Sequence, residues 1–423
     1  MRHHLSPALL VFGLSSGALA CSASAPPAEV TAESQFSVPR VKELMSGDGL
    51  GLVASAVDRA GGVHAVVRNG DDVWYVTNAS QGERRWTTKK LASTAELLAS
   101  MGHDPHPAWV ALQQTAIAVD EDRNVSVAFE LDADLAGERV HTLMALQAIN
   151  GTSQPAGPTI VAQGKHTYDL ALGASRGRLQ VAYWSADPNA TKLDEIRYRA
   201  TAPGASVFGS EVAVACTGDA AGDWTTRKQL KIDHDASGRA HVFCAGGVTL
   251  SHATELEPGS GQFGPGELVP DPGYPNPSMM GVAVDGTPHV TLLAHGGHGS
   301  LDAVHRRSDG EWIHRAYFDE SVDQPPLGAW EHAVYPMANQ AAQAFDRAGQ
   351  PVRVALINKQ SKEGALEKQT LAYFGPDLAR HDVADLDPAN PVWNLTLAVS
   401  PVDDDAIVLF TTLGTTIKLW VAE

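Results

Sequence analysis

A short turn motif recurs along the chain and constrains its fold more than any other feature. With Asp-x-x-Gly-x-x-His as the template, the first copy runs from Asp58 to His64 and the clearest second copy from Asp235 to His241. Weaker copies begin at residues 120, 174, 285, 346 and 400, which makes seven copies spaced 50 to 62 residues apart. A recurring period in this range is typical of propeller blades or of a solenoid.

Each full repeat contains four stretches of alternating apolar residues separated by turn residues, the pattern of half-buried strands. In the first repeat these stretches are residues 52–57, 63–68, 73–77 and 85–91, and in the fifth they are 279–284, 289–294, 301–307 and 312–318. Four antiparallel strands make one blade. The sequence therefore predicts an all-β fold, a seven-bladed β-propeller over residues 35–423.

The last repeat has room for only three strands, at residues 394–399, 406–411 and 416–421. The strand-like segment 36–41 is otherwise unassigned, so we expect it to supply the fourth strand of the last blade. This N-terminal strand would close the ring and remove the exposed sheet edge between the first and last blades.

Several side chains recur at one position of the repeat and are interpreted as packing residues. His64, His241 and His289 are assigned to one template position, where we expect each to pack between blades with a hydrogen-bonded ring nitrogen. Trp86 and Trp312 recur in the fourth strand and are assigned to the core between blades. A side chain that many blades share serves packing, whereas chemistry takes place at one site.

The N-terminus has the features of an export signal over residues 1–20: a positive charge at Arg2, an apolar run over 9–19 and small residues before Cys21. The apolar run is too short to span a membrane. Two interpretations remain open, lipidation of Cys21 or an ordinary signal-peptidase site. Residues 21–34 are rich in Ala, Pro and Ser, as expected of a flexible tether. We expect an exported protein, either a bacterial outer-membrane lipoprotein, a cell-surface or periplasmic protein, or a secreted one.

The remaining cysteines, Cys216 and Cys244, suit a disulfide in an exported chain, with two separate buried thiols as the alternative. The chain has 31 Lys and Arg against 49 Asp and Glu, a net charge of −18, and no basic run longer than two residues. Such a surface disfavours nucleic acid and anionic membranes as partners. We expect a monomer that touches a membrane only through a lipid anchor.

The pattern Ala-x-Asp-x-x-Gly-x-x-His-Val, followed by a third strand and Gly-x-Trp, resembles exported bacterial seven-bladed propellers of the broad sialidase-like, BNR-repeat group. The resemblance covers nearly all of the chain after the tether. The sequence lacks the Ser-x-Asp-x-Gly-x-Thr-Trp box of true sialidases and an identifiable arginine triad, so the resemblance does not imply sialidase activity. Some polysaccharide lyases with related propellers use His, Tyr and Arg in the central face, which keeps an enzyme among the possibilities.

In a propeller, the connections between successive blades and the connections between the second and third strands of each blade lie on the same face. Segments on this face that interrupt only one repeat are the candidate binding elements. The main ones are residues 93–113, 295–299 and 319–339, with smaller ones at 219–227 and 270–277. Their aromatic, imidazole and carboxylate side chains suit sugar rings and hydroxyls. The candidate ligand-binding residues are Trp109, Trp224, His295, His298, Trp330, Glu331, His332 and Tyr335.

Two His-x-x-His pairs, His103 with His106 and His295 with His298, are candidate ligands for a divalent metal such as zinc or copper, with ordinary polar loop residues as the alternative. Two functions remain. One is a non-catalytic propeller that binds a glycan or an envelope protein. The other is a polysaccharide-acting lyase or glycoside hydrolase in which His332 works with Glu331 or Tyr335 in acid–base catalysis.

Overall fold

The structure of the chain is a computed structural model. It describes residues 41–422 except for 80–84, 104–106, 108, 152–156, 165, 187–194, 216–228, 247–248, 271–277, 286–289, 296–300, 319–334, 362–364, 376, 403 and 413–416. Residues 38–423 belong to one folded unit.

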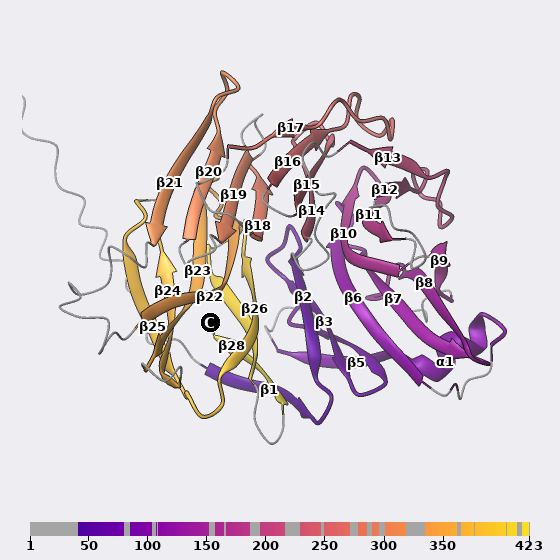
Figure 1. Cartoon of the computed structure of the whole chain (residues 1–423), viewed down its shortest axis with the longest axis horizontal. Helices are drawn as coiled ribbons and strands as arrows, with labels where there is room; N and C mark the ends of the chain where they lie inside the picture. Colours follow the sequence, from indigo (N-terminus) through magenta and orange to yellow (C-terminus); the bar gives the residue numbers. More distant parts are fainter. Residues whose placement is uncertain are drawn as a thin grey trace, which may run out of the picture. The chain divides into compact units, whose positions relative to one another are not determined.

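The strands of the described residues form seven four-stranded antiparallel sheets, and six of these sheets take their strands in chain order (Figure 1). The first three sheets are β2 (Gly51–Val57), β3 (Val63–Asn69), β4 (Asp72–Thr77) and β5 (Thr87–Ser93); β6 (Trp109–Val119), β7 (Val125–Leu135), β8 (Glu138–Leu146) and β9 (Thr159–Gln163); and β10 (His166–Ser175), β11 (Arg178–Ala186), β12 (Glu195–Ala200) and β13 (Val212–Val214).

The next three sheets are β14 (Gln229–His234), β15 (Ala240–Gly246), β16 (Thr249–Thr254) and β17 (Glu267–Leu268); β18 (Ser278–Val284), β19 (Val290–His295), β20 (Leu301–Arg306) and β21 (Trp312–Phe318); and β22 (Tyr335–Phe345), β23 (Pro351–Gln360), β24 (Leu366–Phe374) and β25 (Arg380–Leu386). The last sheet joins β26 (Val392–Val399), β27 (Ala406–Thr412), β28 (Ile417–Ala422) and β1 (Val41–Gly47). The predicted all-β propeller with four-stranded antiparallel blades is confirmed.

The blades are joined into a ring through their first strands. In this ring β2 contacts β6, β6 contacts β10, and the series continues through β14, β18, β22 and β26 back to β2 (Figure 1). The middle parts of these innermost strands line a central channel with a volume of about 460 Å³. Within the described ranges, seven apolar clusters hold the blades together, among them one shared by the first and last blades.

An N-terminal strand completes the last blade, but its position was predicted incorrectly. β1 pairs with β28 from Val41 opposite Ala422 to Gly47 opposite Ile417, whereas the prediction placed this strand at residues 36–41. The reason lies in its composition: Lys42 and Glu43 are exposed at the outer edge of the sheet, which hides the strand pattern. Leu44 and Met45 pack against the core between the first and last blades.

The turn motif has the structural role expected from its residues. The Asp58 carboxylate accepts backbone N–H bonds from Ala60 and Gly62 at 2.8 and 2.9 Å. Glycine at the fourth position has a positive φ, 82° at Gly61 and 76° at Gly238, which side chains disfavour. These bonds and this conformation fix the tight hairpin between the first two strands of a blade.

The packing role predicted for the repeated histidines is confirmed at two of three positions. His64 is buried, with Nε2 3.2 Å from Asp58 Oδ2 and Nδ1 2.5 Å from the Tyr75 hydroxyl. His241 is also buried, with Nδ1 3.0 Å from His252 Nε2. The assignment of His289 to this position was wrong. The hairpin pairs Val284 with Val290, as Val57 pairs with Val63, so Thr291 takes the position of His64. His289 lies outside the described residues.

The predicted interruption at 93–113 begins with a packed helix, α1 (Thr94–Ser100). Ser93 and Glu96 form a capping box in which each side chain bonds the backbone N–H of the other residue. Leu97 and Leu98 are buried in the core of the first two blades. The first half of this segment therefore serves packing. The described residues contain no helix that is long and apolar enough to cross a membrane.

Candidate functional site

Most of the predicted ligand-binding residues lie outside the described part of the chain, so their roles stay predictions. These are Trp224, His298, Trp330, Glu331 and His332, together with the candidate metal ligand His106. His295 ends β19 and Tyr335 begins β22. His103 follows α1, and its backbone N–H bonds the carbonyl of Leu98 at 3.0 Å.

Trp109 is the predicted residue whose surroundings are best defined. It begins β6 at the loop face, which we define as the end of the propeller where β6 and β10 begin and where the β7–β8 hairpin turns. Its side chain is exposed, and the Arg139 guanidinium lies over the indole at 5.1 Å from the ring centroid. This separation is that of a cation–π contact. Trp109 and Arg139 together form what we call the loop-face platform.

Arg139 is held in place by a buried carboxylate. Its Nη2 and Nε donate to Asp132 Oδ2 and Oδ1 at 2.6 and 3.0 Å, while the Arg139 side chain remains 61% exposed and that of Asp132 is fully buried. The Asp132 carboxylate raises the pKa of Arg139 above its ordinary value. The guanidinium is therefore permanently charged, held in position by the buried Asp132 carboxylate, and accessible to solvent.

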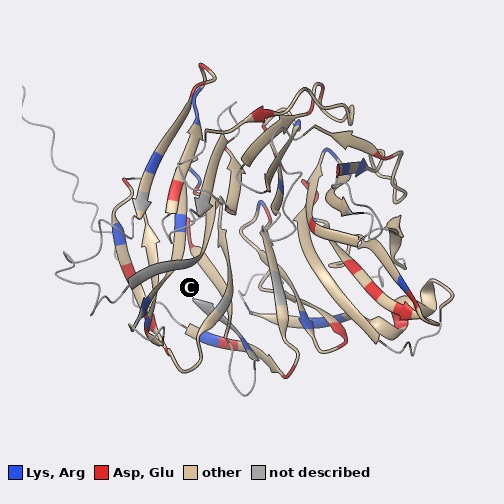
Figure 2. Ribbon diagram, in the orientation of Figure 1, with Lys and Arg blue, Asp and Glu red and all other residues tan. Residues whose placement is uncertain are grey.

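A second carboxylate, Glu130, lies two residues before Asp132 on β7 and so on the same face of that strand. Glu130 Oε1 is 3.1 Å from Nδ1 of His141 on β8, and 3.1 Å from Nδ1 of His166, the first residue of β10. It also accepts the backbone N–H of Thr167 at 3.0 Å. The group therefore joins the second and third blades at the loop face. Figure 2 shows the acidic stretch of β7 in red, and Figure 1 gives the position of the strand.

Sequence reasoning missed Glu130, Asp132, Arg139, His141 and His166 because it searched the segments that interrupt repeats, and these residues belong to strands. One signal was present. β7 is buried on both faces over its first nine residues, yet its sequence contains two acidic residues in that stretch. Buried charges need partners, so an acidic pair within a long apolar run points to a polar cluster.

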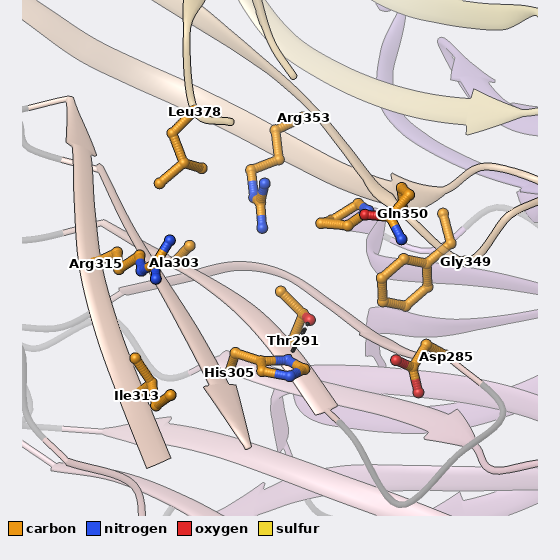
Figure 3. Close-up of a pocket in the computed structure, with 12 residues that line it drawn as sticks. Asp285, Thr291, Ala303, His305, Ile313, Arg315, Gly349, Gln350, Arg353 and Leu378 are labelled. Carbon is orange, nitrogen blue, oxygen red and sulfur yellow. Dashed lines mark hydrogen bonds between the residues drawn. The ribbon is translucent and has the colours of Figure 1, made fainter. Parts of the chain in front are cut away.

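A separate cavity of about 370 Å³ lies at the opposite end of the propeller, between the blades β18–β21 and β22–β25 (Figure 3). Figure 3 shows Arg353, Arg315 and His305 around this cavity, with Asp285 at its edge. Arg353 is buried, and its Nε donates to Gln343 Oε1 at 3.1 Å. We call this space the turn-face cavity.

The turn-face cavity has a counterpart of about 460 Å³ at the junction of the first and second blades, lined by His64, Tyr75 and Arg123 among others. At the junction of the first and second blades, Arg123 stands fourth in the turn and its Nε reaches Asp58 Oδ2 at 2.8 Å. At the junction of the fifth and sixth blades the fourth residue of the turn is Gly349, which has no side chain to make that contact. The cavity is therefore a variation of the packing between blades.

No family model matches this sequence, and no curated protein matches it. Similar solved structures include an α-L-arabinofuranosidase of Fusarium graminearum with an iminosugar inhibitor (TM-score 0.46, 9% identity, 91% of this chain and 98% of that one). Others are a sialidase of Streptococcus pneumoniae (TM-score 0.44, 8%, 90% and 69%) and a variant of the Aleuria aurantia lectin with α-methyl-L-fucoside (TM-score 0.37, 14%, 64% and 77%). At these identities the likeness concerns the fold alone.

Proposed function

We propose that this protein is a glycan-binding propeller that holds its ligand on the loop face, against Trp109 and Arg139. The observation that supports this most is the fixed pairing of an exposed indole with an exposed guanidinium. Sugar rings offer apolar C–H surfaces, which pack on an aromatic side chain, and hydroxyls, which accept hydrogen bonds from N–H donors. Binding sites combine apolar contact area with a few well-placed polar groups in this way.

The platform is organised before a ligand arrives. Arg139 uses Nε and Nη2 on Asp132, and none of the described residues bonds its Nη1 group. A guanidinium has five N–H donors in a rigid fork, so the outward donors point in a set direction. Because Asp132 already restrains this long side chain, less conformational entropy is lost when a ligand binds.

The charge of the chain bears on which glycan is bound. With a net charge of −18, the surface as a whole repels polyanionic chains at a distance. The platform itself has one cation, whose charge is balanced by Asp132. We therefore propose a neutral glycan rather than a sulfated or phosphorylated one.

A glycan-cleaving activity is the alternative, and it is separable by experiment. The acid–base residues proposed from the sequence, His332, Glu331 and Tyr335, belong to the segment 319–339, of which only β22 is described. We also keep export, lipidation of Cys21 and a monomeric state as proposals. Cleavage would release sugar fragments from the bound glycan, whereas a binding protein would leave it intact.

The proposal is tested by screening the exported chain on a glycan array and measuring the affinity for the strongest ligand by calorimetry. Trp109→Ala should weaken binding about tenfold or more, while Trp109→Phe, which keeps an aromatic ring, should retain part of the affinity. Arg315→Ala removes an exposed arginine beside the turn-face cavity and serves as the matched control. Unchanged affinity in Trp109→Ala, or lost affinity in Arg315→Ala, would refute the placement. Mass spectrometry of the glycan decides between binding and cleavage.

A further inference from the structure

We infer that Glu130, His141 and His166 form a binding site for one divalent transition-metal ion of the zinc class, at the junction of the second and third blades. The inference does not depend on glycan binding. It differs from the metal sites predicted from the sequence, because none of these residues belongs to a His-x-x-His pair.

The spacing of the donor atoms suits a small ion. One carboxylate oxygen and one nitrogen from each imidazole all lie within 4.8 Å of one another, and Glu130 Oε1 is 3.1 Å from both Nδ1 atoms. Zinc bonds of about 2.0–2.1 Å in a tetrahedron place neighbouring ligand atoms about 3.3 Å apart. A metal ion could therefore replace the present hydrogen bonds once the two imidazole nitrogens, which lie within 4.8 Å of each other, approach to about that separation. Two histidines and one glutamate form a known zinc ligand set that leaves a fourth position open.

The charge balance of the cluster gives a second, independent observation. Glu130 is fully buried, and its Oε2 atom has no hydrogen-bond partner among the described residues. Its only ion-pair partners in this part of the chain are His141 and His166, neither of which has a permanent positive charge. A buried carboxylate with no permanent cation in contact is costly, and the charge of Arg139 acts on Glu130 without an ion pair between them among the described contacts. A divalent ion would supply the missing positive charge and occupy the space beside the unpaired oxygen.

Neighbouring groups would orient the ligands. The backbone N–H of Thr167 donates to Glu130 Oε1 at 3.0 Å. The rings of Tyr168 and His166 make an edge-to-face contact, with 4.9 Å between their centroids. The Asp132 carboxylate lies 3.5 Å from His141 Nδ1 and is itself held by Arg139. Such outer contacts fix the direction of ligand side chains in metal sites. His166 is 29% exposed, so an ion can reach the cluster from the loop face.

A superficially similar cluster elsewhere lacks these features. His241, His252 and Glu267 also combine two imidazoles with one carboxylate. There the two rings are stacked, with 3° between their planes, and Arg306 Nη1 already pairs with Glu267 at 2.7 Å. That carboxylate has its cation, and it meets Nδ1 of His252 whereas His241 meets Nε2 of the same ring, so the three groups do not face one common point.

The test is to strip the full chain with a chelator, titrate it with ZnCl2 by calorimetry, and count bound zinc by elemental analysis after dialysis. We expect one zinc ion per chain and a rise in melting temperature on binding. His166→Ala and Glu130→Gln should each lose more affinity than the roughly 10- to 100-fold drop caused by removing an outer partner. His314→Ala is the matched control, because His314 is 33% exposed and 2.8 Å from the buried Asp302, and no group of three metal-ligating side chains includes it in the part of the chain that the structure describes.

Cobalt provides a readout that does not depend on stability. Bound Co²⁺ should show the visible absorption of a four-coordinate nitrogen and oxygen site in the wild-type chain and in His314→Ala, and lose it in His166→Ala. The far-ultraviolet circular dichroism of each variant establishes that it is folded. The absence of stoichiometric zinc, or its full retention in a folded His166→Ala chain, overturns the site. Either result leaves the glycan measurement unaffected, since only the metal is used as the probe.

Discussion

Asp58 allows a quantitative test of how neighbouring blades are held together. Its buried carboxylate accepts two backbone N–H bonds within its own turn, lies 3.2 Å from His64 Nε2, and receives Arg123 Nε of the next blade at 2.8 Å. Burial alone would raise the pKa of Asp58. The hydrogen bonds from Gly62, Arg123, Ala60 and His64 outweigh burial and lower the pKa below its ordinary value, so the group is charged at neutral pH.

Asp58→Ala should destabilise the fold because it leaves two buried donors unpaired. The ring nitrogen of His64 and the backbone N–H of Gly62 both lose their acceptor inside the protein. Each orphaned buried donor costs about 1–3 kcal/mol. Arg123 is 43% exposed and can turn to water, so its contribution is small. We expect the free energy of unfolding to fall by about 2–4 kcal/mol.

The matched control is Asp120→Ala, at the same position of the second repeat. Asp120 accepts the backbone N–H groups of Asp122 and Asn124 at 2.9 and 2.7 Å, in exposed surroundings. This variant should cost about 1 kcal/mol or less, because water can satisfy the freed groups. Urea titration at pH 7 measures both values. Equal losses in the two variants would refute the reasoning.

The pH dependence of the folding stability tests the same carboxylate. The folded pKa of Asp58 is below the unfolded value of about 3.9. Its stabilisation is therefore fully present above that unfolded pKa and is lost as the pH falls through the folded pKa. The stability gap between the wild-type chain and Asp58→Ala should shrink below about pH 4.

Three further predictions concern the fold. Deleting residues up to 47 removes β1, exposes the edge of β28 and should lower the melting temperature sharply; an unchanged value would contradict closure by β1. Cys244 is disulfide-bonded, and its predicted partner Cys216 lies outside the described residues; peptide mapping without reduction should find the two linked, and two free thiols would disprove it. Burial raises the pKa of Asp233 to about 6. The protonated carboxyl group therefore contributes to the stability of the fold in full below the unfolded pKa of about 3.9, and this contribution is lost as the pH rises through about 6. Asp233→Asn should flatten that fall between about pH 4 and 6 in thermal melts, and an equal fall in the variant would exclude Asp233 as its cause.

The fold could be predicted closely wherever strand alternation and turn chemistry agree. The predicted strand at 312–318 matches β21, because apolar alternation and an Asp-Gly turn act together there. The closing strand was misplaced because an edge strand needs only one packed face, and Lys42 and Glu43 hide its pattern. His289 was misassigned because the segment 285–289 was taken as a turn two residues shorter than that of the first repeat, whereas the pairing of Val284 with Val290 encloses five residues, as that of Val57 with Val63 does.

The candidate site was less accessible to sequence reasoning. Trp109 could be found because it lies in a segment that interrupts one repeat. Glu130, His141 and His166 come from three strands of two blades, and His166 follows Glu130 by 36 residues. No local spacing connects them. Only the pairing of β7 with β8, and the packing of β10 beside β7, brings their donor atoms together.

The most direct test of the central proposal is a crystal structure of the chain with the glycan that binds most strongly on the array. We predict a sugar ring packed on the exposed indole of Trp109, with one of its hydroxyls within hydrogen-bonding distance of the Arg139 guanidinium. A sugar bound instead in the turn-face cavity, between Arg353 and Asp285, with Trp109 bare, would contradict the proposal.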